Sequence, residues 1–194
     1  ASLLMSSDFA MNSRVATALA FGIKTDTLGF TRNFNAVDVR ALLWINAWVD
    51  KDKLRAIEMP PRSIAALESF SNALSEKQQI DKLILAPVHN LTDRDSLAQI
   101  ADFLLPTEGI DTVITYGLRR NKVILSVRSN KADFHVGKAL SRAFPDGLAG
   151  GHKSLGGGQI PLDFFAQQAD LDEPHYHKIV MDRTKQLLED IFTN

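Results

Sequence analysis

The residues best suited to chemistry are a histidine and a lysine, His152 and Lys153, within a glycine-rich run. Six of the chain's 11 glycines lie between Gly147 and Gly158. Glycine allows positive φ angles and lets a ligand approach the main chain closely, and successive main-chain N–H groups in such a turn can form an anion-binding concavity. The imidazole and ammonium groups add hydrogen-bond donors suited to phosphate. The run therefore predicts a phosphate-binding loop, and the alternative is a glycine-rich turn with an incidental histidine.

A second candidate is an arginine at the end of an apolar stretch. Residues 123–125 and 127 are apolar, and Arg128 stands where polar residues begin. A guanidinium group can hold phosphate through two parallel hydrogen bonds. We therefore expect Arg128 to join the glycine run in one anion pocket. The alternative is that Arg128 pairs with a surface carboxylate such as Asp133.

The charge of the chain is unevenly distributed. The formal net charge is −1, but eight Lys and Arg residues stand against two acids between Arg119 and Lys153. A local basic field suits a small anionic ligand or a short nucleic acid, although a solvated basic surface would give the same pattern. The chain lacks the interleaved aromatic and basic residues of a long single-strand groove, which favours short ligands.

Few residues are placed to bind a metal ion. Asp26 lies in a threonine-flanked polar segment, and a lone aspartate there is more often a cap than a ligand. Hard divalent cations need several oxygen or imidazole ligands. His175 and His177 are two residues apart, so on a strand or a helix their side chains diverge and do not favour one shared ion.

Composition limits the class of protein. Hydrophobic residues make up 45% and charged residues 23% of the chain, as in ordinary globular proteins. The absence of cysteine excludes disulfides and thiolate metal sites and is compatible with a reducing compartment. No apolar run reaches the length of a membrane span, and no signal peptide is recognisable. We expect a cytoplasmic protein without membrane contact.

The pattern of apolar residues changes along the chain. Residues 15–23 and 35–49 show helical spacing, the first helix ending near Gly22 before a polar turn at residues 24–27. Pro60 and Pro61 interrupt the chain, and Ser63 can cap a following helix. Beyond residue 80, apolar strands alternate with amphipathic helices, which indicates an α/β layered domain. The strands are expected at residues 82–88, 112–118 and 122–127, and the helices at 93–105, 132–144 and 174–192.

Two motifs together resemble one family. Residues 15–27 (VATALAFGIKTDT) resemble a motif late in the catalytic domain of the DHH phosphoesterases. Residues 123–157 resemble the hallmark of their DHH-associated C-terminal domain, in which Arg-Ser at a strand end, here Arg128-Ser129, precedes a short helix and a Gly-Gly-His loop. The chain resembles the C-terminal part of such a protein, a group that includes RecJ-like exonucleases, nano-RNases and exopolyphosphatase-related proteins.

The resemblance implies an α/β fold with a defined division. A mostly helical remnant of the catalytic domain (1–60) and a connector helix (61–80) would precede a smaller substrate-binding domain (81–194), whose mixed sheet is flanked by helices. One departure is Leu155, where many members have a small residue. The implied metal ligand is Asp26. The implied phosphate-binding residues are Arg128, Ser129, Gly150, Gly151, His152, Lys153 and Gly156.

The family's Asp-rich and Asp-His-His motifs, which hold most ligands of a manganese or magnesium centre, do not occur in this sequence. We therefore expect the fragment to bind no metal stably and to be inactive alone. An incomplete first domain exposes apolar surface, which a homodimer would cover.

The resemblance leaves two function classes open. The first is the substrate-binding part of a metal-dependent phosphoesterase, a hydrolase acting on nucleotides, short RNA or DNA, or polyphosphate. The alternative is an RNA-binding or nucleotide-sensing module without catalysis, since a similar domain occurs in alanyl-tRNA synthetases.

Overall fold

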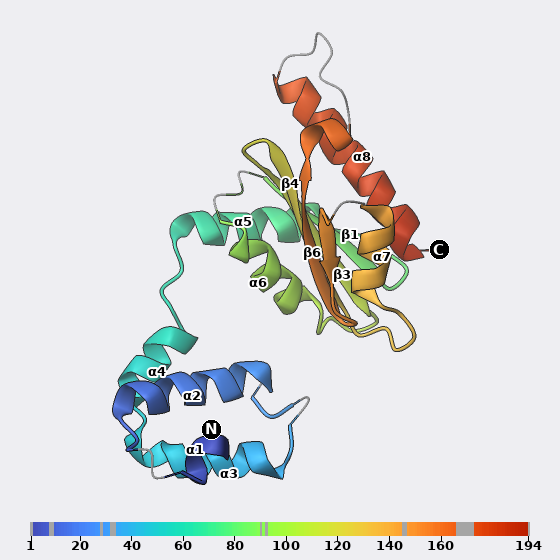
Figure 1. Ribbon diagram of the computed structural model, residues 1–194. Coiled ribbons are helices and arrows are strands. Elements are labelled where there is room, and N and C mark those ends of the chain that lie inside the picture. Colours follow the sequence, from blue (N-terminus) through green and yellow to red (C-terminus); the bar gives the residue numbers. More distant parts are fainter. Residues whose placement is uncertain are drawn as a thin grey trace. The chain divides into compact units, whose positions relative to one another are not determined.

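The computed structural model describes residues 2–7, 10–27, 29–31, 34–89, 91, 93–144, 147–165 and 173–193 (Figure 1). The chain divides into two compact units, residues 1–62 and residues 63–194. The first unit is helical and the second is built on a mixed sheet, so the fold is α/β. Within the described residues, no helix is both long enough and apolar enough to cross a membrane.

The first unit contains four short helices and one 3₁₀ turn in its described part. Asn12 caps the longest helix by accepting a hydrogen bond from the Val15 N–H, and Asn35 and Asp38 form a reciprocal capping box. The buried residues Ala16, Ala20 and Ile45 make a small core. The elements are α1 (Ser2–Met5), α2 (Ser13–Asp26), α3 (Ala36–Ile45), η1 (Asn46–Trp48) and α4 (Lys51–Glu58).

Two predicted boundaries in this unit are wrong. Helix α2 passes through Gly22 and ends at Asp26, because a single glycine in a helix costs only about 1 kcal/mol. The polar segment at residues 24–27 is therefore mostly the last turn of a helix. Helix α3 stops at Ile45 and is followed by the 3₁₀ turn, whereas helical spacing predicted one helix to residue 49.

The second unit is organised by a six-stranded sheet in the order β1-β2-β3-β4-β6-β5. Strands β2 and β3 are parallel and joined through helix α6, and the other neighbouring pairs are antiparallel. This is the mixed sheet that the sequence predicts. The strands are β1 (Gln78–Ile80), β2 (Leu83–Val88), β3 (Thr112–Arg119), β4 (Lys122–Ser129), β5 (Ala149–Gly151) and β6 (Leu155–Pro161).

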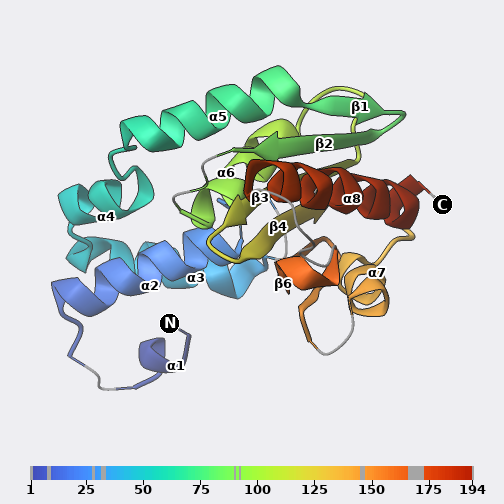
Figure 2. The same ribbon diagram turned by 90° about the horizontal axis from the view of Figure 1, so that it is seen from above.

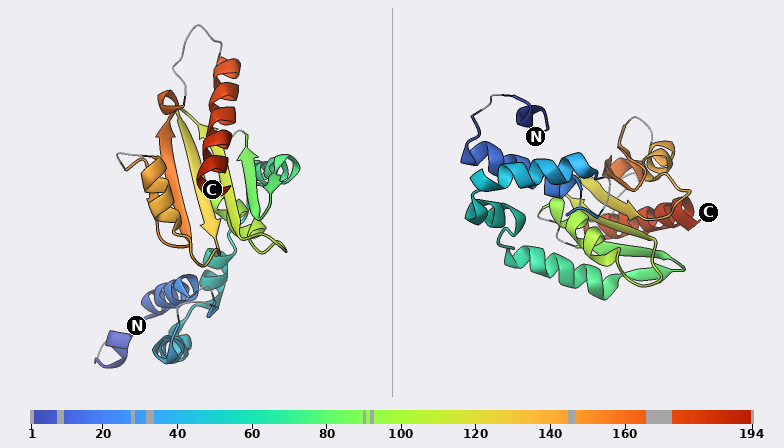
Figure 3. Two further views of the ribbon diagram at one scale, coloured as in Figure 1. Left: turned by 90° about the vertical axis from the view of Figure 1, so that its right-hand side faces the viewer. Right: turned by 90° about the horizontal axis from the view of Figure 1, so that it is seen from below.

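Helices cover both faces of this sheet, with α5 (Ile64–Glu76) and α6 (Asp95–Leu104) on one and α7 (Val136–Ala143) and α8 (Glu173–Thr193) on the other (Figures 1 and 2). A 3₁₀ turn, η2 (Leu162–Phe164), follows β6. The left view of Figure 3 shows α8 in front of the strands and running roughly along them, with α7 beside the outer strands. The segment expected to be a connector, residues 61–80, contributes Phe70 and Ala73 of α5 to the core against β2, and its last residues form β1.

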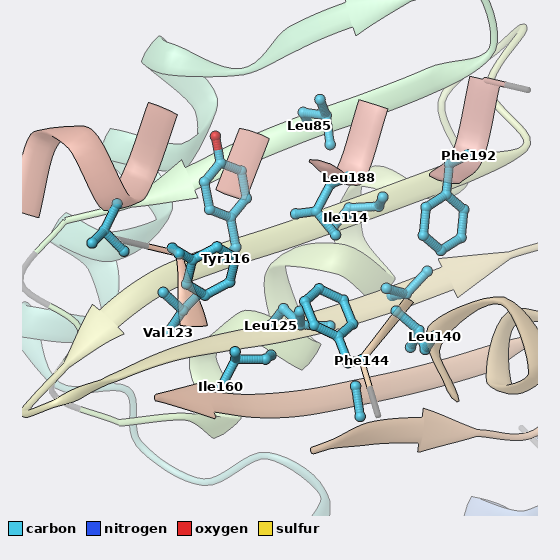
Figure 4. Close-up of a cluster of buried hydrophobic side chains, with 14 of the residues drawn as sticks. Leu85, Ile114, Tyr116, Val123, Leu125, Leu140, Phe144, Ile160, Leu188 and Phe192 are labelled. Atoms are coloured by element: carbon cyan, nitrogen blue, oxygen red, sulfur yellow. The ribbon is translucent and has the colours of Figure 1, made fainter. Parts of the chain in front are cut away.

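The alternation of side chains along β4 divides the core into two clusters. Val123, Leu125 and Val127 face α7 and α8, where Phe144 and Leu188 are completely buried (Figure 4). Ile124, between them, joins the cluster beneath α5 and α6. This period of two fixes the register, because a slip of one residue would exchange the two faces. It also fixes which face Arg128 occupies.

Candidate phosphate-binding site

The glycine-rich run forms a β-hairpin rather than an open loop. Strands β5 and β6 pair antiparallel, with Gly150 opposite Gly157 and Gly151 opposite Gly156. The hairpin closes where the N–H of His152 donates to the carbonyl of Leu155 at 2.8 Å. That N–H is therefore used inside the protein, so the expected anion site made of successive main-chain N–H groups does not include it.

Helix α7 packs so closely against the hairpin that glycine is needed at Gly137 in α7 and at Gly156 in the hairpin. A Cβ on Gly137 of α7 would lie 2.1 Å from the carbonyl oxygen of Gly151. A Cβ on Gly156 would lie 2.7 Å from Leu140 and 2.8 Å from Val136, both in α7. These approaches exclude any side chain. Glycine at Gly156 therefore serves the packing of α7 against the hairpin.

The turn of the hairpin is anchored by its own carbonyl groups. The carbonyl of His152 accepts a hydrogen bond from the Gly137 N–H at 3.0 Å, and that of Lys153 accepts one from the Val136 N–H at 3.0 Å. The carbonyl of Ser154 accepts a hydrogen bond from the Ser129 N–H at 2.9 Å. The main chain is thus fixed, while the side chains of His152 and Lys153 are exposed. Both side chains are available to a ligand.

The register brings Arg128 and His152 into one row. Arg128 on β4 lies opposite Leu155 on β6, and Leu155 in turn receives the N–H of His152. Neighbouring strands are about 4.8 Å apart, so the main chains of Arg128 and His152 are separated by roughly 10 Å, within reach of their long side chains. The next pair on the same face of the sheet is Ser126 and Gly157, and Gly157 has no side chain.

A hollow of about 610 Å³ opens beside these rows at the edge of the sheet. Glycine dominates its lining, so much of its surface is main chain. The helix α6 contacts β3 and β4, whereas the hairpin strands pack against α7. The lining residues are Gly147, Leu148, Ala149, Gly150, Gly157, Gly158 and Gln159.

Arg128 is held against helix α6. Its Nε donates to Asp102 Oδ1 at 2.6 Å, and one terminal nitrogen donates to Ser126 Oγ at 3.1 Å. The Arg128 side chain is only 18% exposed, whereas that of Asp102 is 61% exposed. The carboxylate partner is therefore Asp102 and not Asp133. This arrangement orients the guanidinium group.

Ser129 is buried and hydrogen-bonded within the protein. It is 2% exposed, its Oγ lies 2.9 Å from Thr112 Oγ1, and it accepts a hydrogen bond from the Lys131 N–H at 3.2 Å. Because its neighbour Arg128 faces α6, Ser129 faces the opposite side of the sheet. We therefore give Ser129 a positioning role at the end of β4.

The described residues do not bring metal ligands together. Asp26 is the last residue of α2, and no group of three or more His, Asp or Glu side chains in the described part of the chain could hold an ion. His175 and His177 lie in the first turn of α8, two residues apart on a helix, where their side chains diverge. The residues present do not fit a two-metal centre by themselves.

Sequence reasoning missed two residues of this site. Asp102 carries no signal beyond its place on the polar side of an amphipathic helix. Gly137 does carry one, because a glycine inside a predicted helix is unfavourable and suggests close packing. Both residues act by positioning Arg128 or the hairpin.

Comparisons with known proteins agree with this architecture. Residues 81–173 match the model of the DHHA1 domain. The uncharacterized protein MJ1633 of Methanocaldococcus jannaschii is 32% identical over 168 residues, covering 86% of this chain and 34% of that protein. The crystal structure of an exopolyphosphatase-related protein from Bacteroides fragilis aligns with a TM-score of 0.62 and 16% identity, covering 93% of this chain and 52% of that chain. The chain thus spans about a third and about half of these two proteins.

Proposed function

We propose that this chain, whose residues 81–173 match the DHHA1 domain, belongs to the DHH superfamily and is the substrate-binding part of a metal-dependent phosphoesterase. The proposed substrates are nucleotides, short nucleic acids or polyphosphate. The observation that carries the proposal is the row of Arg128, Leu155 and His152 across β4 and the glycine hairpin. The description of the Bacteroides fragilis protein as exopolyphosphatase-related supports the same class of substrate.

The proposed chemistry of the site is phosphate binding and orientation. Arg128 offers a guanidinium already oriented by Asp102, and His152 and Lys153 offer exposed donors at the other end of the row. Gly157 and its neighbours let the phosphate approach the main chain. A fixed phosphate lowers the entropic cost of placing the scissile bond for attack.

Hydrolysis requires groups beyond those described. A two-metal centre would activate water and stabilise the leaving oxygen, and manganese or magnesium is the proposed metal of the intact protein. Asp26 is one carboxylate, and a divalent ion needs about six ligands. We therefore propose that the chain alone does not turn over a phosphodiester when Mn²⁺ is added.

Isothermal titration of the chain with AMP tests the phosphate site. Arg128→Ala and His152→Ala should each weaken binding by about 1.5–3 kcal/mol, the value of a hydrogen bond to a charged group. Lys122→Gln, which removes an exposed charge at the other end of β4, is the matched control and should bind like the wild type. Unchanged AMP affinity of the hairpin in both site variants, read from the hairpin amides, would overturn the assignment. Turnover of an added phosphodiester by the wild-type chain with Mn²⁺ would contradict the expected inactivity.

The second candidate function is an RNA-binding or nucleotide-sensing module without catalysis. It is favoured by the excess of basic residues between Arg119 and Lys153. Such a module would bind RNA oligomers with an affinity that falls steeply as salt rises and grows with oligomer length. A phosphate-holding site of a phosphoesterase would instead saturate with mononucleotides or dinucleotides.

A further inference from the structure

A second cavity, of about 540 Å³, lies at the other end of the sheet from the glycine hairpin. It opens where β2 ends at Val88 and near the ends of β3 and α8. Strands β2 and β3 are the parallel pair of the described sheet, and ligands of α/β sheets bind outside the carboxyl ends of parallel strands. The polar residues of its lining are His89, Arg120, His177, Lys178 and Asp182.

The charged groups of this cavity are not neutralised by one another. Neither Arg120 nor Lys178 forms an ion pair within the part of the chain that the structure describes, and Asp182 forms none there either. His89 is oriented by Glu76, whose carboxylate lies 2.8 Å from its Nε2. The cavity is therefore lined by two cationic side chains and one carboxylate that can each bind a group of a ligand.

The backbone at Arg120 is an independent sign of a requirement for this side chain. Arg120 has φ = 54° in the two-residue turn that joins β3 to β4. That left-handed conformation favours glycine, and an arginine there is conformationally strained. Strain of this kind gathers at binding sites. The arginine at this position places a cation in the lining of the cavity.

We propose that this cavity binds a small phosphate monoester whose organic part carries hydroxyl groups. Arg120 and Lys178 would hold the phosphate, and Asp182 would accept hydrogen bonds from the hydroxyls. Leu118 and Met181 supply an apolar wall for the organic part, and the volume is that of an ordinary small-molecule site. Strand β4 runs from this end to Ser129 beside the hairpin, so the two sites are roughly 23 Å apart at 3.3 Å per residue.

The test is a titration of the ¹⁵N-labelled chain with AMP, followed by NMR of backbone amides. Amides of residues 118–122 and 177–182 should shift together and saturate at one dissociation constant. Arg120→Gly and Lys178→Gln should each weaken this binding at least about ten-fold. Arg120→Gly also relieves the strained φ, so it should keep or raise the melting temperature, which separates loss of binding from loss of fold. Lys122→Gln is the charge-matched control and should leave the binding unchanged.

Two further arms identify the ligand chemistry. Adenosine should not bind, and inorganic phosphate should bind more weakly than AMP. Asp182→Asn should reduce the advantage of AMP over inorganic phosphate. Shifts confined to the hairpin at residues 150–157, or unchanged AMP affinity in both cation variants, would overturn the proposal. Because the hairpin amides report separately, failure of one site is distinguishable from failure of the other.

Discussion

Replacing Gly137 by alanine should push helix α7 away from the glycine hairpin. The new Cβ would lie 2.1 Å from the carbonyl oxygen and 2.4 Å from the carbonyl carbon of Gly151, closer than the 3.0 Å that real Cβ contacts respect. Both partners are main chain, so no side chain can rotate away. The distance between α7 and the hairpin must therefore increase by roughly 1 Å, against the tight packing of the surrounding core.

The cost follows from the contacts that such a shift disturbs. Overpacking of this kind costs about 1–3 kcal/mol. The hydrogen bonds from Val136 and Gly137 to the hairpin carbonyls contribute about 1 kcal/mol each. Alanine's better helix propensity returns about 1 kcal/mol. The net loss in the free energy of unfolding should be about 2–4 kcal/mol.

Gly22→Ala is the matched control, because Gly22 is also helical and a Cβ there would meet nothing within 4 Å. It should gain about 0.5–1 kcal/mol from helix propensity alone. Both tryptophans lie in the first unit and both tyrosines in the second. Urea unfolding followed by tryptophan fluorescence therefore reports Gly22→Ala, and tyrosine signals or hydrogen exchange of α7 report Gly137→Ala. Gly137→Ala as stable as the wild type would refute the packing argument.

Two other measurements check the structure. Burial, together with Glu189 and Asp182, raises the pKa of Tyr116 well above its ordinary value. In the unfolded chain this tyrosine ionises near pH 10, whereas in the folded protein it stays protonated there. The free energy of unfolding should therefore be unaffected by Tyr116 below about pH 10 and should fall by up to about 1.4 kcal/mol per pH unit above it. Tyr116→Phe should remove this part of the alkaline loss, and melting temperatures of both proteins from pH 8 to 11 would show equal slopes if the reasoning fails. Limited trypsin digestion should cut after Arg62, in the extended segment before α5, and leave a resistant 63–194 piece; a first cut inside α5 or the sheet would contradict this domain boundary.

The elements with regular periodicity could be predicted from the sequence. Strands β2, β3 and β4 and helices α6 and α8 lie within two residues of the expected bounds, because their apolar spacing records burial directly. Strands β5 and β6 could not be predicted in this way. Their glycines carry no hydrophobic pattern, and the close approach of α7 to Gly156 depends on a helix that local sequence does not place.

The sequence suggested that the candidate residues lie near one another, but not which residues surround them. The spacing of Arg128 and the glycine run suggested one pocket, and the register of β4, β6 and the hairpin supplies the geometry for that proposal. The partner of Arg128 depends on how α6 crosses the sheet, which local sequence does not specify. The burial of Ser129 also depends on the fold. The motif implied that Ser129 binds phosphate, but side chains alternate along β4, so Ser129 faces the side of the sheet opposite to Arg128 and is buried.

The order of strands has a consequence for how fast the second unit folds. Apart from the exchange of β5 and β6, neighbours in the sheet are neighbours along the chain. The β3–β4 hairpin closes through two residues, and a hairpin of this kind forms in about 1–10 μs. The parallel pairing in the described sheet encloses helix α6, a separation of 29 residues between Leu83 and Thr112. The β4–β6 pairing closes a comparable stretch, from 27 residues between Arg128 and Leu155 to 39 between Lys122 and Pro161. Closing these two long loops, with their larger loss of chain entropy, should set the folding rate of the unit.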